Sequence, residues 1–166
     1  MDRSVDLATE LSRLSPRRGS FPWPNHEYVR GWGVFGLPFD SGHVLALRVF
    51  PDNDFAPYST IWHRAPNGSW SIFADAPRLD IACPRYYGPA CGVTAQAHID
   101  LAERMYFIES STAALDDVNL GRPTHLDEPP VIGNVTLPCR GVLAVGQAAW
   151  QIRDPVEYQR TRAETE

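Results

Sequence analysis

The sequence contains no lysine, and all fifteen of its basic residues are arginine. Walker loops and protein kinases need a lysine to hold nucleotide phosphates, and Schiff-base enzymes need one for their covalent adduct. The missing lysine therefore excludes these classes. Positive charge is not concentrated anywhere, because the arginines are dispersed along a chain of net charge −5. A nucleic-acid backbone is bound by concentrated positive charge, so we expect no nucleic-acid partner.

Cysteine and long apolar runs are scarce as well. The 166 residues include three cysteines, and no run approaches the ~18 apolar residues that a membrane-spanning helix needs. Residues 1–14 carry acidic side chains and lack the apolar centre of a signal peptide. We therefore expect a cytoplasmic protein without a membrane span, whose thiols are reduced.

Metal ligands in a recognisable pattern are also missing. Cys83 and Cys91 do not have the spacing of a zinc site. His98 is predicted on a polar strand face, whereas His43 and His63 are predicted on apolar faces. Three convergent ligands are therefore not expected. No metal and no other cofactor is predicted.

Short apolar runs between turns make up most of what is present. Fifteen prolines and twelve glycines separate these runs, which is typical of many short strands rather than long helices. Apolar and polar residues alternate with the period of two that defines a strand. Asn67-Gly68 adds a strong hairpin signal. The strands predicted on this basis cover residues 43–50, 58–65, 69–75, 92–102, 104–110 and 141–152.

The two ends of the chain carry helix signals instead. Ser4 precedes leucines at helical spacing, and Asp154 precedes a proline and an acidic residue in the pattern of a helix start. The predicted fold class is therefore mainly β, an antiparallel barrel-like or sandwich sheet with a short helix at each end. The predicted organisation is an N-terminal helix and loop (1–26), a β domain (27–152) and a C-terminal helix and tail (153–166).

The segment 31–36 matches the glycine pattern G-x-G-x-x-G of dinucleotide-binding proteins. That function requires a helix immediately after the third glycine. A turn sequence, Leu37 to Gly42, follows instead. We therefore interpret the glycines as bends in a strand.

The hairpin around Asn67-Gly68 suggests a first set of site residues. With a two-residue turn, Trp62 pairs with Phe73 and His63 pairs with Ile72. One sheet face then carries Trp62, Arg64, Phe73 and Asp75, a mixture that suits either a ligand cavity or a solvated surface. His63 lies on the apolar face, where it serves as a structural residue or as a catalytic one.

A second set lies in residues 75–91, which concentrate arginine, tyrosine and aspartate. Arg85, Tyr86 and Tyr87 are residue types that recognise anions and line pockets. The alternative is an ordinary loop with an arginine–aspartate pair. Cys83 beside Arg85 can also be interpreted as a nucleophile of lowered pKa, although that chemistry needs a histidine base.

Several runs of the sequence resemble one protein family. They are GVFGLPFDSGHVLALRVF (33–50), TIWHRAPNGSWSIFAD (60–75), ACPRYYGPA (82–90), DVNLGRP (117–123) and LPCRGVLAVGQA (137–148). Together they are similar to the lipocalin-like β proteins related to hydroxyneurosporene synthase and carotenoid hydratase. The resemblance implies a lipocalin-like fold and an apolar, terpenoid-like ligand. Family members have further strands between the parts that meet here near Ala102 and Glu103. The barrel therefore need not be complete, and an exposed sheet edge would favour a homo-oligomer.

Three functions follow as hypotheses. The first is a β domain that binds a small apolar molecule through Trp62, Arg64, Phe73, Arg85, Tyr86 and Tyr87. The second is a hydratase, isomerase or lyase that acts on such a molecule, with His63, Asp75 and Asp80 as its acids and bases. The third is a shortened relative that acts only as an interaction protein.

Overall fold

The computed structural model describes residues 24–101, 108–110 and 118–165. The helix predicted near Ser4 lies outside these residues, as does most of the strand predicted at 104–110. The described part is mainly β, which confirms the fold class in its coarser form. Only short helical segments interrupt or follow the strands.

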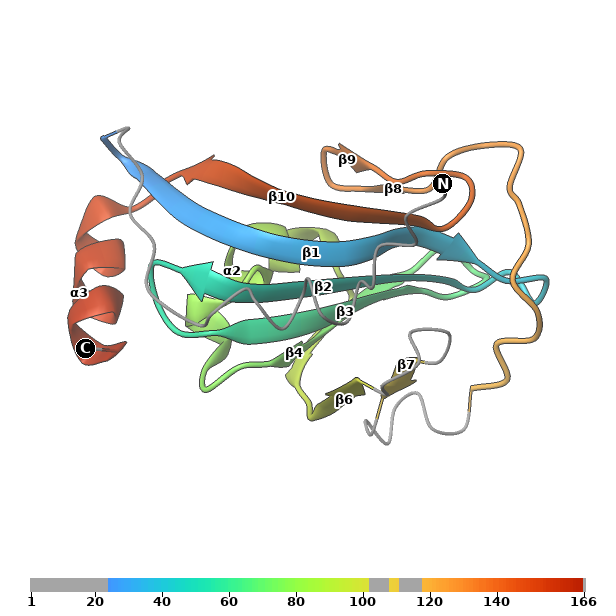
Figure 1. Cartoon of the computed structure of the whole chain (residues 1–166), viewed down its shortest axis with the longest axis horizontal. Coiled ribbons are helices and arrows are strands. Elements are labelled where there is room, and N and C mark those ends of the chain that lie inside the picture. Colours follow the sequence, from blue (N-terminus) through green and yellow to red (C-terminus); the bar gives the residue numbers. More distant parts are fainter. Residues whose placement is uncertain (1–23, 102–107, 111–117, 166) are drawn as a thin grey trace, which may run out of the picture.

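The main sheet has six strands and is twisted and open (Figure 1). All neighbouring strands are antiparallel except β4 and β5, which are parallel. Within the described residues the sheet ends at β10 on one side and β5 on the other, so a closed barrel is not formed there. In spatial order the strands are β10 (Val142–Gln151), β1 (His26–Pro38), β2 (Val44–Asn53), β3 (Tyr58–Arg64), β4 (Trp70–Asp75) and β5 (Val93–Gln96).

Two small sheets accompany the main one. The first pairs β6 (Ile99–Leu101) with β7 (Ile108–Ser110), and the second pairs β8 (Val131–Ile132) with β9 (Val135–Thr136). The single strand predicted at 92–102 is thus divided between β5 and β6. The chain turns away from the main sheet at Ala97 and His98.

The glycines of β1 bend a continuous strand, as the sequence predicted. Pairing with β2 shifts register between Arg30 and Trp32 and again between Val34 and Leu37. A Cβ atom at Gly33 would lie 2.3 Å from the carbonyl oxygen of Leu47. Only glycine permits this close approach of the two backbones.

The hairpin of β3 and β4 has a different register from the predicted one. Trp62 pairs with Ile72 and His63 with Ser71, one residue away from the predicted partners. The turn is longer than two residues: Gly68 donates to the Ala65 carbonyl and has a φ of 87°. This is the geometry of a type I turn closed by a bulge glycine. A shift of one residue reverses the face of each partner side chain, so Trp62 and Phe73 lie on opposite faces.

A helical segment connects the parallel strands β4 and β5. Parallel neighbours need a connection that crosses one face of the sheet. Here it consists of η1 (Leu79–Ile81), α2 (Pro84–Tyr87) and η2 (Gly88–Ala90), and α2 lies behind β1 and β2 in the view of Figure 1. Ala82 and Cys83 are buried in this layer against Trp62. The segment therefore covers the face of the sheet that holds the site described below.

The C-terminal helix α3 (Pro155–Thr165) confirms the second helix prediction. Asp154 caps it, because its Oδ1 accepts hydrogen bonds from the amides of Val156 and Glu157, both at 3.0 Å. Tyr158 packs edge-on against Phe55.

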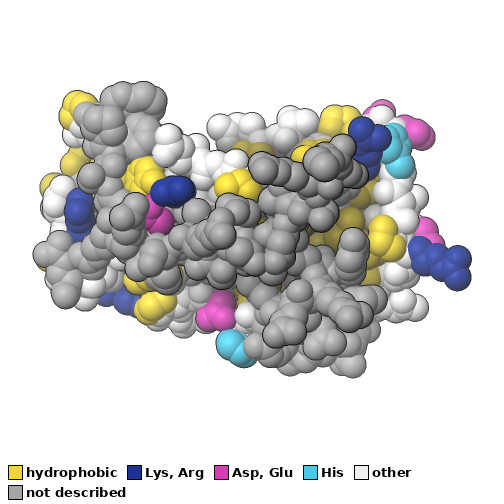
Figure 2. All heavy atoms as spheres, in the orientation of Figure 1, with side chains coloured by type: hydrophobic (Ala, Val, Ile, Leu, Met, Phe, Trp, Pro, Cys, Tyr) yellow, Lys and Arg dark blue, Asp and Glu magenta, His cyan; other side chains and the backbone are white. Residues whose placement is uncertain are grey.

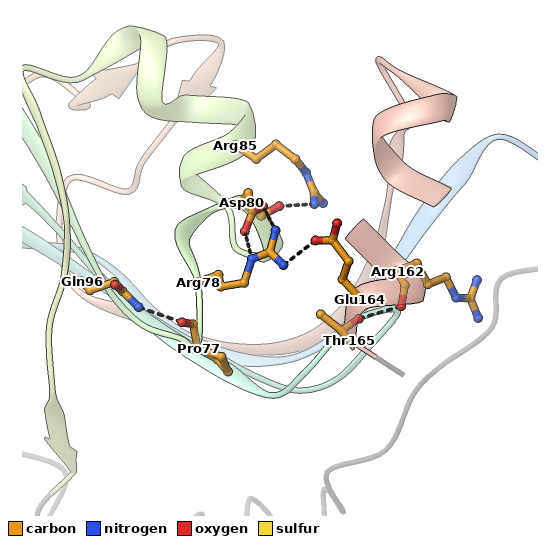
Figure 3. A network of polar contacts seen from close by, with 8 residues as sticks. All are labelled: Pro77, Arg78, Asp80, Arg85, Gln96, Arg162, Glu164 and Thr165. Carbon is orange, nitrogen blue, oxygen red and sulfur yellow. Dashed lines mark hydrogen bonds and ion pairs between the residues drawn. The ribbon is translucent and has the colours of Figure 1, made fainter. Parts of the chain in front are cut away.

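A polar network joins α3 to the start of the crossing segment (Figure 3). Arg78 donates to both oxygens of Asp80 and contacts Glu164 of α3 at 2.6 Å. Arg85 donates to the Asp80 carbonyl at 2.6 Å. These contacts hold the segment that carries Tyr86 and Tyr87 in place.

The opposite face of the sheet has its own apolar cluster, which includes Trp32, Leu45, Leu47 and Ile61.

On the molecular face shown in Figure 2, the basic side chains of the described residues are scattered and not gathered into a patch. Among the described helices, none is both long and apolar enough to cross a membrane.

Candidate ligand-binding site

A cavity of about 270 Å³ lies on the face that the crossing segment covers. Its floor consists of small residues on β1 and β10. Gly31 pairs with Gly146, and Val29 pairs with Ala148. Because these side chains are short or absent, the two strands leave open space above the sheet. A Cβ atom added at Gly146 would meet no heavy atom within 4 Å.

Aromatic side chains form the walls of this cavity. Phe35 and Phe50 rise from β1 and β2, Trp150 from β10, and Tyr87 from α2. The rings of Phe50 and Trp150 meet edge to face at 6.1 Å, and those of Tyr87 and Trp150 at 6.2 Å. These contacts link three elements around one apolar space.

Among the described residues, Arg48 is the charged one that lines the cavity. It occupies the centre of β2, where it pairs with Gly33 on one side and Thr60 on the other. Only 8% of its surface is exposed. Its guanidinium lies 3.8 Å from the ring centre of Trp62 and 5.0 Å from that of Phe35.

The charge of Arg48 has no carboxylate partner in the described part of the chain. The ion pairs there join other residues, and the buried Nε atom of Arg48 has no hydrogen-bond partner. Burial lowers the pKa of Arg48, and the neighbouring Cys83 and Tyr87 counter only part of that effect. Arginine nevertheless stays charged in proteins.

The polar groups around Arg48 are neutral. Burial raises the pKa of the Cys83 thiol and of the Tyr58 hydroxyl. Neither group therefore supplies a negative charge at neutral pH. The site is a buried cation among aromatic rings and uncharged donors.

Cation–π contacts offset only part of the cost of this burial. Each contributes about 0.5–2 kcal/mol, whereas removing a charged group from water costs several kcal/mol even after relaxation. The face of Trp62 is the best placed of the three rings near Arg48, and Tyr87 is the most distant at 6.0 Å. The balance for the Arg48 charge within the described structure therefore remains unfavourable.

The predicted ligand-binding residues lie in four places. Trp62 and Tyr87 come together beside Arg48, with ring centres 5.0 Å apart. Phe73 lies on the opposite sheet face, and Arg64 is half-buried at the end of β3. The remaining two, Arg85 and Tyr86, belong to a neighbouring buried pair.

That neighbouring pair is centred on Glu27, which is buried at the start of β1. Its carboxylate accepts hydrogen bonds from Arg85 and from the Tyr86 hydroxyl. Burial raises the pKa of Glu27, and the charge of Arg85 opposes this shift. Tyr86 also packs on Trp150 at 5.1 Å, so the pair supports a wall of the cavity.

The predicted catalytic residues do not form one group. His63 lies on β3 in a hydrogen bond with His43, with Nδ1 of His43 and Nε2 of His63 2.7 Å apart. Asp75 at the end of β4 contacts His98, and Asp80 binds Arg78. Burial, aided by His43, lowers the pKa of His63 to about 4. Across the described ranges, no cluster of three His, Cys, Asp or Glu side chains is placed to hold a metal ion.

Cys83 does not have the lowered pKa that a nucleophile needs, which corrects that interpretation of the sequence. The thiol is fully buried and lies 3.6 Å from the Thr60 hydroxyl. Burial raises the pKa of Cys83, because a thiolate would be poorly solvated there. The role of Cys83 in the described structure is packing.

Sequence reasoning missed the central residue of the site. Arg48 interrupts an otherwise apolar alternation in β2, and that interruption was the available signal. Phe35, Trp150 and Glu27 gave no comparable signal, because their roles depend on pairing between the two ends of the chain.

Comparison of the chain with family models, curated proteins and solved structures finds no match in any of the three. The resemblance to lipocalin-like proteins related to hydroxyneurosporene synthase stays a prediction. The fold and the site together define an open β-sheet protein with an aromatic-walled cavity over one face.

Proposed function

We propose that this protein binds a small, largely apolar molecule in the cavity between β1, β10 and Tyr87. The observation that carries the proposal is an aromatic-walled space above a floor of glycine and alanine, with one buried polar group at its side. Ligand pockets are typically concave, mostly apolar and equipped with a few well-placed polar groups.

The size of the cavity limits the ligand. Its volume of about 270 Å³ lies near the lower end of the range of ~300–1,000 Å³ for ligand pockets. A short acyl chain, a monoterpenoid or a bicyclic aromatic compound is the class of molecule that this space suits. A terpenoid of this kind agrees with the ligand that the sequence resemblance implies.

Binding of a fluorescent apolar probe tests the proposal directly. The naphthalene dye Prodan, added to the folded protein, should show a saturable increase in fluorescence, and native mass spectrometry of gently purified protein should show a carried molecule. Absence of both signals from a protein that unfolds cooperatively would contradict the proposal.

Gly146 provides a variant that fills the cavity without disturbing the sheet. Gly146→Leu places a side chain into the open space above β10 and should weaken Prodan binding by about tenfold or more, because the filled volume excludes the ligand. Thermal stability should stay equal or rise, since glycine weakens a strand.

Gly146→Ala is the matched control, because it adds only a Cβ atom where no heavy atom lies within 4 Å. Its probe affinity should stay within about threefold of the wild type. Equal probe affinity in the leucine and alanine variants would place the bound probe outside this cavity.

A further inference from the structure

We infer that the ligand of this cavity is a monocarboxylate, whose carboxylate pairs with Arg48 while its apolar part lies over the floor of β1 and β10. The inference rests on the proposed function and specifies its ligand class. It follows from three features of Arg48: its burial, its missing counter-charge and its position beside the apolar space.

Burial and the missing counter-charge indicate that the partner of Arg48 comes from outside the described chain. Arg48 is more than nine-tenths buried, its Nε has no hydrogen-bond partner, and the described ion pairs do not include it. By contrast, the other deeply placed arginine of this layer, Arg85, is paired with Glu27. One buried arginine is thus neutralised within the fold, and the other faces the cavity.

The surroundings of Arg48 select the charge and shape of the anion. A single guanidinium balances a single negative charge, and none of the other described residues that line the cavity is a cation. A doubly charged phosphate monoester would keep an uncompensated charge among Phe35, Phe50 and Trp150. The planar guanidinium also matches the planar carboxylate in hydrogen-bond geometry.

The position of Arg48 sets the orientation of the ligand. Arg48 stands on β2, beside the glycine floor of β1, and Trp62 and Tyr87 lie around its guanidinium. The rest of the cavity extends over β10 towards Trp150. A carboxylate at Arg48 therefore directs the apolar tail across Gly146.

Three probes that share a ten-carbon tail and differ only in their head group measure what the head group contributes to binding. Isothermal titration calorimetry should show that decanoate binds the wild-type protein about tenfold or more tightly than 1-decanol, because a charge-assisted hydrogen bond replaces a neutral one. Decylamine should bind more weakly than either, since its ammonium would meet the like charge of Arg48.

Arg48→Met and Arg30→Met form a matched pair of variants. Arg48→Met should abolish the preference for decanoate over decanol, because the apolar side chain keeps the volume and removes the charge. Arg30 is exposed on β1 and lies outside the cavity lining, so Arg30→Met should keep the wild-type preference despite the same change in net charge.

The outcomes distinguish this inference from the function on which it rests. Equal binding of decanoate and decanol to the wild type would overturn the carboxylate inference and leave the apolar cavity standing. Failure of all three ten-carbon probes and of Prodan to bind would overturn both the carboxylate inference and the proposed function. If Arg48→Met fails to fold, the comparison of decanoate with decanol on the wild-type protein still tests the carboxylate inference. The variant Arg48→Lys retains the positive charge and should keep part of the preference for decanoate.

Discussion

At the scale of the residue, Arg48 is the feature that most needs an explanation. A cation in the centre of an apolar strand costs stability when its counter-charge is missing. The aromatic rings around it reduce this cost, and the strand would pair equally well with an apolar residue at that position. The residue is thus better explained by what it binds than by what it contributes to folding.

Stability measurements can test this explanation without any ligand. Arg48→Met should leave the ligand-free protein as stable as the wild type or more stable by about 1 kcal/mol, because apolar replacement of an unfavourable buried charge is often stabilising. Urea denaturation of both proteins measures the difference. The exposed Arg30→Met control should change stability by less than about 0.5 kcal/mol. A loss of more than about 2 kcal/mol in Arg48→Met would assign Arg48 a structural role instead.

The lowered pKa of His63 predicts how the stability of the protein depends on pH. Its pKa is lowered from 6.5 to about 4 in the fold, so the unfolded chain binds more protons between these values. Stability is therefore fully present above about pH 6.5 and is lost as the pH falls towards about 4. Between about pH 7.5 and about pH 5, this one group should remove about 2 kcal/mol from the free energy of unfolding.

The variant His63→Gln isolates that contribution, because glutamine does not titrate. Urea denaturation at both pH values should show a smaller loss for the variant than for the wild type, by about 2 kcal/mol. The same acid sensitivity in both proteins would show that His63 is not held neutral by the fold.

At the scale of the element, the sequence predicted most strands of the main sheet and the capped helix α3, but not every register and not the small strands β8 and β9. The alternation of residues 43–50 and the Asp154 cap are local signals, and both survive in the structure as β2 and α3. The register of β3 and β4 failed because Ala65 and Pro66 join the turn, so Gly68 becomes a bulge residue. A local motif gives the hairpin, whereas the length of its loop decides which side chains share a face.

The crossing segment shows a second limit of sequence reasoning. Its arginines and tyrosines marked it as functional, and Tyr87 does reach the cavity. The parallel pairing of β4 and β5, which sends this segment over the sheet, is a long-range feature without a local signal. The same applies to Glu27, whose partner Arg85 lies far away in the sequence. Predicting such pairs requires knowing which elements meet.

At the scale of the whole molecule, the site depends on contact between the two ends of the β domain. β1 and β10 come from opposite ends and build the cavity floor by antiparallel pairing. The crossing segment then supplies a wall from the middle of the chain. Each contributor alone is an ordinary strand or helical turn, and the cavity exists only after all three have assembled.

The position of β10 also makes a prediction about association. Within the described residues its ten residues form an outer strand of the main sheet, and they include no charged residue and no proline. Natural edge strands usually carry such residues, because unpaired backbone groups invite pairing with another chain. We therefore expect two copies of the protein to associate through β10 as the concentration rises, which would extend the cavity floor across the contact.

Sedimentation velocity over a range of concentrations measures this association, and Val145→Lys tests its location. Val145 is 58% exposed on β10, and a lysine there places like charges on both copies of the edge. The variant should stay monomeric at concentrations where the wild type forms dimers. Val156→Lys is the matched control, because it makes the same change at a residue that is 80% exposed and lies on the helix α3 rather than on the sheet edge. Dimers that persist in Val145→Lys would place the contact elsewhere on the molecule, and a wild type that stays monomeric throughout would show that β10 is protected in solution.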